Sequence, residues 1–235
     1  MEKKRWSYSR LTTHETCGWQ YKLIYEDLMP KEQNGYGEFG TLMHMAIELI
    51  INGEDGYSFY VDNMNIENIP NGKFEEYSVV VPEFLRAFKP TSFHGEIVGT
   101  EKEFSLDIDS ENEFTGIIDL ILKSDNSYTL VDWKISKIFN KITLKEKQKQ
   151  LYLYSNYVYQ TYGVYPNKMF FYFPAVYANK KYIEINWLEA DYKEAYNWML
   201  NEINSVNTTE RKPNTDNWIM CNRLCAVKNH CQYTL

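Results

Sequence analysis

Apolar and polar residues follow two different periods along this chain, and each period predicts one kind of element. Short stretches that are rich in β-branched and aromatic residues and bounded by turn-forming residues are typical of strands. These stretches are 98–108, 113–122, 128–135, 168–176 and 181–187. Apolar residues that recur three and four positions apart predict helices at 40–51, 144–163 and about 192–203. The two patterns together predict an α/β fold.

Capping residues set the expected ends of the helices. Ser9 can cap a first helix, and a second helical stretch follows Cys17. Thr143, with Glu146 three residues later, forms a capping box at the start of the long helix. Gly163 is expected to end that helix, with a proline shortly beyond it.

Residues 52–95 have no strong period and are polar, with frequent Asn, Gly and Pro. We interpret them as loops with one short helix near 79–88, forming an insertion in a single domain of residues 1–235. With 44% hydrophobic residues the chain can build a substantial core. No apolar run approaches the ~20 residues that span a bilayer, so no membrane contact is expected.

The cysteines form a three-plus-one pattern. Cys221, Cys225 and Cys231 lie in a polar tail, and Cys17 lies near the start. This pattern favours a metal centre that joins the two ends of the chain, because four thiolates complete a zinc site or ligate one iron–sulfur cluster. A disulfide pair is the alternative. No apolar signal segment opens the sequence, which predicts a cytoplasmic protein that is not secreted and therefore disfavours disulfides.

The strongest chemical signal lies on the hairpin between the second and third predicted strands. If Asp125 and Asn126 form a two-residue turn, Asp119 stands opposite Asp132. Two facing carboxylates repel each other unless a cation lies between them. Lys134 follows two residues after Asp132, so it points to the same face of the sheet. The surrounding residues are apolar, which places these charges in otherwise buried strands.

Two acids and a lysine around a hard cation suit the hydrolysis of phosphodiesters. Carboxylate oxygens hold Mg²⁺ or Mn²⁺, and the metal ion activates a water molecule and neutralises charge on the phosphate. The lysine orients that water or stabilises the transition state. The D-x-K pattern alone is weak evidence, because it also occurs as two solvated charges on exposed strands.

Further motifs occur in a fixed order along the chain. They are GTLMH at 40–44, GIID at 116–119, VDWK at 131–134 and QLYLY at 150–154. Together with the opening segment 7–27, this order resembles the RecB-like branch of the PD-(D/E)XK nucleases. The three-plus-one cysteines are similar to the iron–sulfur ligands of the AddB nuclease domain and of CRISPR-associated RecB-type nucleases. The resemblance covers about Ser7 to Cys231.

The resemblance implies a restriction-endonuclease-like core, in which helices flank a mixed β-sheet. The metal ligands and the catalytic lysine that it implies are His44, Asp119, Asp132, the carbonyl of Trp133, and Lys134. Gln150 and Tyr154, four positions apart on one helix face, would line the site and contact the substrate or the lysine. Without the resemblance, a histidine such as His44 in an apolar helix is usually a core residue.

The resemblance further implies a 4Fe–4S cluster held by Cys17, Cys221, Cys225 and Cys231. Two departures from the family pattern keep Zn²⁺ open as the alternative. Gly18 stands where the family commonly has proline, and three residues separate Cys221 and Cys225 where two are usual. His230 is also placed to substitute for a thiolate at zinc.

The implied activity is that of a Mg²⁺- or Mn²⁺-dependent DNA nuclease, with exonuclease action on single-stranded or frayed ends. It would serve recombination, repair or mobile-element DNA processing in a bacterial or phage-infected cell, with recombination, helicase or CRISPR-type partner proteins. The alternative is a non-catalytic DNA- or protein-binding module of the same fold. The intact motif residues disfavour that alternative, because a decayed site usually loses one of them.

The charge of the chain limits how it can meet DNA. The net charge is −7, so any contact with nucleic acid must be local. A lysine-rich stretch directly follows the D-x-K motif, and its members Lys137, Lys141, Lys145 and Lys149 are candidates for contacts with phosphates. The alternative for this stretch is an ordinary solvated helix face.

Overall fold

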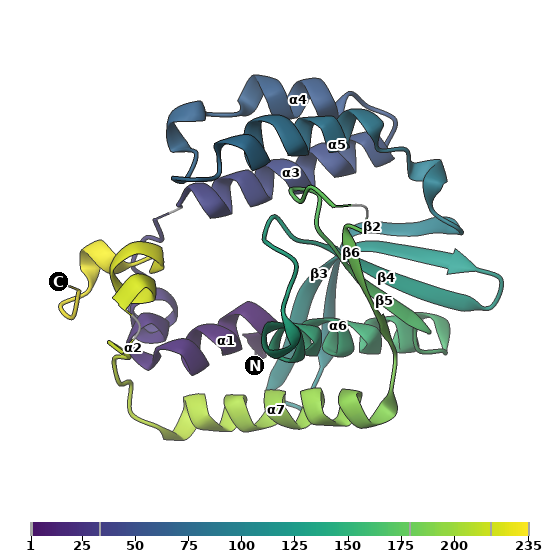
Figure 1. Ribbon diagram of the computed structural model, residues 1–235. Helices are drawn as coiled ribbons and strands as arrows, with labels where there is room; N and C mark the ends of the chain where they lie inside the picture. The colour runs from purple at the N-terminus through teal and green to yellow at the C-terminus, as the bar shows by residue number, and fades with distance from the viewer. Residues whose placement is uncertain (1, 33, 179, 217, 235) are drawn as a thin grey trace. The chain divides into compact units, whose positions relative to one another are not determined.

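The computed structural model describes residues 2–32, 34–178, 180–216 and 218–234 (Figure 1). The chain divides into two compact units. Unit 1 consists of Met1–Asn34, Ser105–Gly116 and Tyr196–Leu235, and unit 2 consists of Gly35–Phe104 and Ile117–Ala195. Each unit is therefore built from segments far apart in the sequence. Within the described residues, no helix is long and apolar enough to cross a membrane.

The strands are β1 (Lys4–Trp6), β2 (Glu96–Asp107), β3 (Asn112–Ser124), β4 (Ser127–Trp133), β5 (Lys168–Tyr172) and β6 (Tyr182–Asn186). They form a mixed sheet in the order β1-β3-β4-β5-β6, and β2 pairs with β3. The pairs β1/β3 and β4/β5 are parallel, and the pairs β3/β4 and β5/β6 are antiparallel. The predicted α/β fold with a mixed sheet flanked by helices is confirmed. Only β1 was not predicted, because three residues are too few to show a period.

The β3/β4 hairpin has the predicted register. Leu120 pairs with Val131, and Ser124 pairs with Ser127 across the turn. Asp125 in that turn has a φ of 54°, the left-handed value that a tight two-residue turn requires. Continued by one residue, this register places Asp119 opposite Asp132, as the sequence predicts.

Three helices of unit 2 lie side by side in Figure 1: α3 (Gly35–Ile51), α4 (Gly56–Asn63) and α5 (Val81–Ala87). The π-helical turn η3 (Glu76–Val80) leads into α5, and the short 3-10 turns η2 (Ile66–Asn68) and η4 (Pro90–Ser92) flank this region. Residues of these helices share one apolar core with Leu120, Leu122, Val131 and Trp133 of the hairpin. This core fixes α3 relative to the ends of β3 and β4.

The short helix predicted near 79–88 is confirmed by η3 and α5, but the expectation that the rest of 52–95 forms loops is wrong, because α4 also lies there. Tyr60 and Tyr77 are fully buried, and the Tyr60 hydroxyl donates to the carbonyl of Tyr77 at 3.0 Å. Burial of these two tyrosine rings stabilises helices in a segment whose sequence is otherwise polar. That the region is an insertion in one nuclease domain stays a prediction.

The long helix α6 (Lys141–Tyr162) contacts β4. It begins earlier than predicted, because Asn140 is the N-cap and its side chain accepts a hydrogen bond from the Thr143 backbone N–H at 2.9 Å. Asparagine is among the preferred N-caps, so it takes the position that the sequence analysis had given to Thr143. The helix ends at Gly163, which has a φ of 79°, as predicted.

The remaining helices are α1 (Tyr8–Thr16), α2 (Gly18–Tyr21), η1 (Lys22–Glu26), α7 (Glu189–Thr208), η5 (Met220–Leu224) and η6 (Lys228–His230). Ser7, and not the predicted Ser9, caps α1 by accepting from the Arg10 N–H at 3.1 Å. In unit 1, the fully buried Trp6 of β1 donates to Asn112 of β3 at 2.8 Å. A small core of Leu23, Ile24, Cys225 and Val227 joins η1 to the C-terminal tail.

Candidate active site

Unit 2 gathers charged side chains around the β3/β4 hairpin. Asp119 on β3 and Asp132 on β4 are buried, with exposed fractions of 7% and 3%. Burying a carboxylate is costly unless it is paired or hydrogen-bonded. The hydrogen-bond and ion-pair partners of these two acids therefore define the chemistry of the site.

Asp119 is held by the backbone and faces a histidine. Its Oδ2 accepts a hydrogen bond from the Trp133 backbone N–H at 2.7 Å. His44 of α3 places Nδ1 3.6 Å from the same oxygen and Nε2 3.1 Å from the Trp133 carbonyl oxygen. His44 is thus bound into the polar site and is not an apolar core residue.

Asp132 is paired through both of its oxygens. The Lys134 Nζ lies 2.6 Å from Oδ2, and the Gln150 side-chain amide donates to Oδ1 at 2.9 Å. Lys134 also donates to Gln150 Oε1 at 3.3 Å, and Gln150 donates to the Tyr154 hydroxyl at 3.2 Å. Gln150 and Tyr154 are four residues apart on α6, so one helix face holds the acid–lysine pair in place.

Glu101 of β2 joins the site, although no sequence pattern had singled it out. Its Oε1 lies 3.4 Å from His44 Nδ1. One ligand atom each from His44, Glu101 and Asp119 lie within 4.8 Å of one another, a spacing that suits a shared metal ion. One imidazole nitrogen and two carboxylate oxygens are donors that fit Mg²⁺ or Mn²⁺.

The backbone of Glu101 is strained. Its φ is 41°, a left-handed value inside a strand, where L-residues with side chains rarely occur. Such conformations cost of order 1–3 kcal/mol and cluster at functional sites. In the sequence, Glu101 and the exposed Glu103 occupy alternate positions of TEKEF, so the alternation of faces along a strand does not distinguish them. Only the turn of the backbone distinguishes it.

The site shifts the pKa values of its groups in a consistent way. Burial, followed by the charge of Asp132, raises the pKa of Asp119 to about 7. Burial alone would lower the pKa of His44, but the hydrogen bond to Glu101 and the charges of Asp119 and Asp132 outweigh it and raise the pKa to about 9. Burial likewise opposes the charge of Lys134, yet Asp132 and Asp119 raise its pKa. Near neutral pH, Lys134 and His44 are therefore charged and Asp119 is only partly ionised, so a bound cation would displace protons from His44 and Asp119.

The predicted site residues divide into two neighbouring sets. His44 and Asp119 lie with Glu101 in the group that fits a cation. Asp132 binds Lys134 and Gln150, and the Trp133 carbonyl faces His44. The assigned roles of these side chains, including the metal-ligand roles of Asp132 and Trp133, stay predictions.

The lysines that were predicted to contact DNA lie in or just before α6, where acids accompany three of them. Lys149 lies 2.7 Å from Glu146, and Lys145 lies 3.4 Å from Glu194. Lys137 precedes the helix, and its charge helps to lower the pKa of Glu76 after the hydrogen bond from Lys73. Lys141 is the first residue of α6. Their contact with phosphates stays a prediction.

The cysteines lie together in unit 1. None of the four forms a disulfide, and all four line one pocket of about 100 Å³. The Cys17 Sγ accepts hydrogen bonds from the backbone N–H groups of Gln20 at 3.4 Å and Asn214 at 3.3 Å. Burial, and then the neighbouring thiols, raise the pKa of Cys221. Four cysteines around one pocket are the ligand number that a thiolate-bound metal or cluster requires, and binding would remove the thiol protons.

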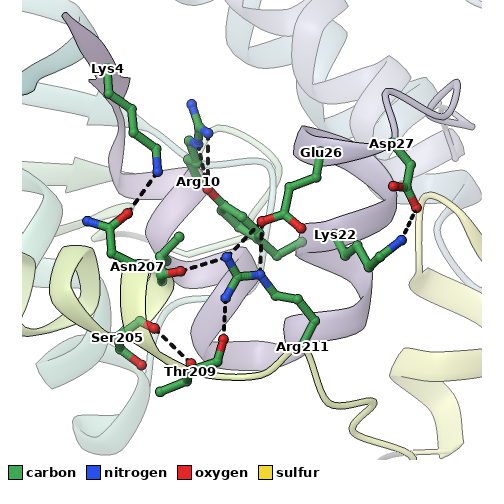
Figure 2. A network of polar contacts seen from close by, with 11 residues as sticks. Lys4, Arg10, Lys22, Glu26, Asp27, Ser205, Asn207, Thr209 and Arg211 are labelled. Carbon is green, nitrogen blue, oxygen red and sulfur yellow. Dashed lines mark hydrogen bonds and ion pairs between the residues drawn. The ribbon is translucent and has the colours of Figure 1, made fainter.

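A network of polar contacts ties the tail segment to η1 within unit 1, as Figure 2 shows. The Arg211 guanidinium donates to Glu26 Oε1 at 2.7 and 3.0 Å. The same group donates to the carbonyls of Val206 at 2.6 Å and Thr209 at 2.8 Å. Gly18 lets the tail pass closely, because a Cβ there would lie 3.1 Å from the Lys212 backbone nitrogen. The segment before Cys221 is therefore fixed against the helices that follow Cys17.

Comparison with known proteins agrees with the fold. No curated protein matches the sequence. The chain is similar to the crystal structure of a protein described as a "putative exonuclease" from Eubacterium rectale, with a TM-score of 0.60 and 13% identity over 97% of this chain and 88% of that one. It also matches the crystal structure of SSO0001, with a TM-score of 0.49 and 13% identity over 100% of this chain and 89% of that one. The family model of the PD-(D/E)XK nuclease superfamily matches residues 5–232, and the chain therefore belongs to this superfamily.

Proposed function

We propose that the protein is a Mg²⁺- or Mn²⁺-dependent deoxyribonuclease of the RecB-like branch. One observation supports this proposal above the others: a cation-sized group of His44, Glu101 and Asp119 lies beside the charged pair of Asp132 and Lys134. DNA binding alone gives no reason to bury two carboxylates and to pair them with His44 and Lys134. Because the chain belongs to a nuclease superfamily, the reaction expected at this site is the hydrolysis of phosphodiester bonds.

The residues have distinct parts in the proposed reaction. His44, Glu101 and Asp119, with Asp132 and the Trp133 carbonyl as further candidates, would hold the cation. When bound, the cation supplies an activated water and neutralises charge on the scissile phosphate. Lys134 remains protonated and faces that phosphate region, so it stabilises the negative charge that grows in the transition state.

Gln150 and Tyr154 position the charged groups. Gln150 accepts from Lys134 and donates to Asp132, so it fixes the lysine ammonium relative to the carboxylate. Burial and the charge of Asp132 raise the pKa of Tyr154, so its hydroxyl stays neutral and accepts from Gln150. Both residues are expected to affect turnover more than substrate binding.

We further propose exonuclease action on single-stranded or frayed DNA ends, in recombination, repair or mobile-element DNA processing. The motif order and the fold shared with the Eubacterium rectale protein support this assignment. Lys137, Lys141, Lys145 and Lys149 would contact flanking phosphates. Cys17, Cys221, Cys225 and Cys231 would hold a 4Fe–4S cluster, or Zn²⁺ in its place.

End-labelled single- and double-stranded DNA, incubated with Mn²⁺, Mg²⁺ or EDTA, tests the proposed activity. The wild type should shorten the labelled strand with either metal ion and not in EDTA. Lys134→Met should reduce the rate by roughly 100- to 1,000-fold, as expected when a transition-state interaction is removed. Lys168→Met is the matched control, because Lys168 lies on β5 of the same sheet and pairs with Glu184 at 2.9 Å. Tight DNA binding without metal-dependent cleavage by the wild type would favour the non-catalytic module.

A further inference from the structure

A cavity of about 680 Å³ in unit 2 begins at the residue after the proposed catalytic lysine. Three segments line it, namely 72–76, 135–138 and 175–177. Residues 135–138 continue directly from Lys134, and the Tyr77 hydroxyl donates to the Ile135 carbonyl at 3.5 Å. The volume falls within the ~300–1,000 Å³ typical of pockets for small ligands. The cavity thus adjoins the candidate active site along the chain, and it has no part in the metal group.

Much of the lining of the cavity is apolar, with aromatic side chains that solvent can reach. Ile135, Ile138 and Val176 supply aliphatic surface. The side chains of Phe74 and Tyr177 are 58% and 60% exposed. Two large exposed aromatic residues at one apolar hollow mark a surface for binding, because scattered apolar exposure would not gather at a concave site.

The charges around the cavity cancel. Lys73 and Lys137 carry two positive charges, and Glu75 and Glu76 carry two negative charges. Lys73 Nζ lies 2.7 Å from Glu76 Oε1, and its hydrogen bond, with a contribution from the charge of Lys137, lowers the pKa of Glu76. A phosphate would meet these acids as well as the lysines. The cavity therefore suits an uncharged flat ring better than a phosphate group.

We propose that this cavity receives a nucleobase of the DNA strand next to the bond that is cut, stacked against Phe74 and Tyr177. The proposal rests on the proposed nuclease function. If a phosphate of the strand lies at Lys134, the cavity is within reach of a neighbouring base, because its lining begins one residue later at Ile135. In a duplex that base is paired and stacked, so entry into the cavity requires a base that is already free. The substrate is then a single strand or a frayed end, read without regard to base identity, because every base has a face that stacks on an aromatic ring.

Equilibrium binding in EDTA tests the base pocket separately from catalysis. A fluorescent oligothymidylate and an abasic strand of the same length present the same phosphates, but only the first presents bases. The wild type should bind the thymidylate more tightly. In the double variant Phe74→Leu, Tyr177→Leu, this preference should fall roughly tenfold, because leucine keeps the apolar bulk and removes the stacking face. The control Tyr182→Leu alters an aromatic residue of β6 that is 37% exposed and lies outside the cavity, and it should keep the preference.

Several outcomes separate this proposal from the nuclease function. An unchanged preference in the double variant, with melting curves like those of the wild type, would overturn the base pocket. Equal binding of thymidylate and abasic strands by the wild type would overturn it too. Mn²⁺-dependent cleavage by the wild type is measured in parallel. Absence of cleavage, together with a preference that disappears in the double variant, would sink the nuclease proposal and leave the base pocket standing.

Discussion

The two groups of side chains that are proposed to bind metal in this molecule are built in opposite ways. In unit 2, the acids meet partners that the protein itself supplies: Asp132 binds Lys134 and Gln150, and Asp119 binds the Trp133 backbone. In unit 1, four thiols line one small pocket, with backbone N–H donors to Cys17. The first arrangement is held by hydrogen bonds and ion pairs. The four cysteines of the second would be held together by the metal ion or cluster that is proposed to bind them.

The difference separates two uses of a bound metal. A pre-organised site keeps its geometry when the ion leaves, so removal of the ion should stop the reaction and leave the fold intact. A site in which the ion is the main link between distant segments should lose stability with it. Substitutions and metal titrations can test whether unit 2 and unit 1 divide along this line.

The largest effect is expected from Asp119→Asn. It removes a proposed metal-ligand charge and should lower cleavage by roughly 1,000-fold or more, while asparagine can still accept from the Trp133 N–H. The pKa of Asp119 in the folded protein, about 7, lies above the ~3.9 of an unfolded chain, so its ionisation removes stability as the pH rises through 7. The variant should therefore melt no lower than the wild type at pH 8. A clear drop in its melting temperature would break the comparison.

A second effect concerns the cysteine group in unit 1. Cys17→Ser and Cys231→Ser should each lower the free energy of unfolding by about 3 kcal/mol or more, well above an ordinary surface change. If one cluster or ion joins both cysteines, the double variant should lose little more than either single variant. Protein purified without oxygen should be brown and carry iron and sulfide, or colourless with one zinc per chain. A shared centre would be contradicted if the purified protein carried neither iron nor zinc and the decreases in the free energy of unfolding were additive.

The pH dependence of metal binding should sharpen the picture of unit 2. With a pKa of about 9, His44 is protonated at pH 7 and must release that proton to bind an ion. Apparent Mn²⁺ affinity should therefore rise with pH between 7 and 9, by about tenfold per unit for each proton displaced. Titration calorimetry in buffers of different ionisation enthalpy counts the protons. His44→Asn should release fewer protons, and an equal count would remove His44 from the ligand set.

The smallest effect is expected from the lysine-rich stretch. Neutralising Lys141, Lys145 and Lys149 should reduce the slope of log affinity for single-stranded DNA against log salt, by at most ~0.7 for each phosphate interaction that is removed. The acids beside Lys145 and Lys149 should keep the change below the full sum, because they already neutralise part of the charge. Lys168 and Lys193, which pair with acids elsewhere in unit 2, provide the control. An unchanged slope would indicate that the lysine-rich stretch is an ordinary solvated helix face.

Local chemistry made the centre of the fold predictable. The hairpin register followed from the turn at Asp125 and from the alternation of faces, both of which depend on adjacent residues. Helix starts were less predictable because neighbouring caps compete, as Asn140 and Thr143 show. In 52–95, helices are stabilised by buried tyrosines such as Tyr60, and a sequence pattern cannot tell a buried tyrosine from an exposed one.

The candidate site was predictable only in part. His44 and Gln150 were found through motif order, and their contacts depend on helices that the sequence had placed correctly. Glu101 was missed because its contact with His44 comes from a residue with a left-handed backbone conformation inside a strand. No residue near it, such as glycine, indicates that conformation. Its role depends on tertiary structure alone.

The discontinuous make-up of the two units has a consequence for biosynthesis. Every residue of unit 2 has been made once the ribosome passes Ala195, whereas unit 1 needs the segment Tyr196–Leu235. At ~5–20 residues per second, the carboxylate site is complete some seconds before the last cysteine is added. A nascent chain that stalls between Ala195 and Cys221 carries every proposed catalytic residue but only Cys17 of the four thiols. Incorporation of a metal at the cysteines would then follow synthesis of the carboxylate site, and it would distinguish chains that include Cys231 from chains interrupted before Cys221.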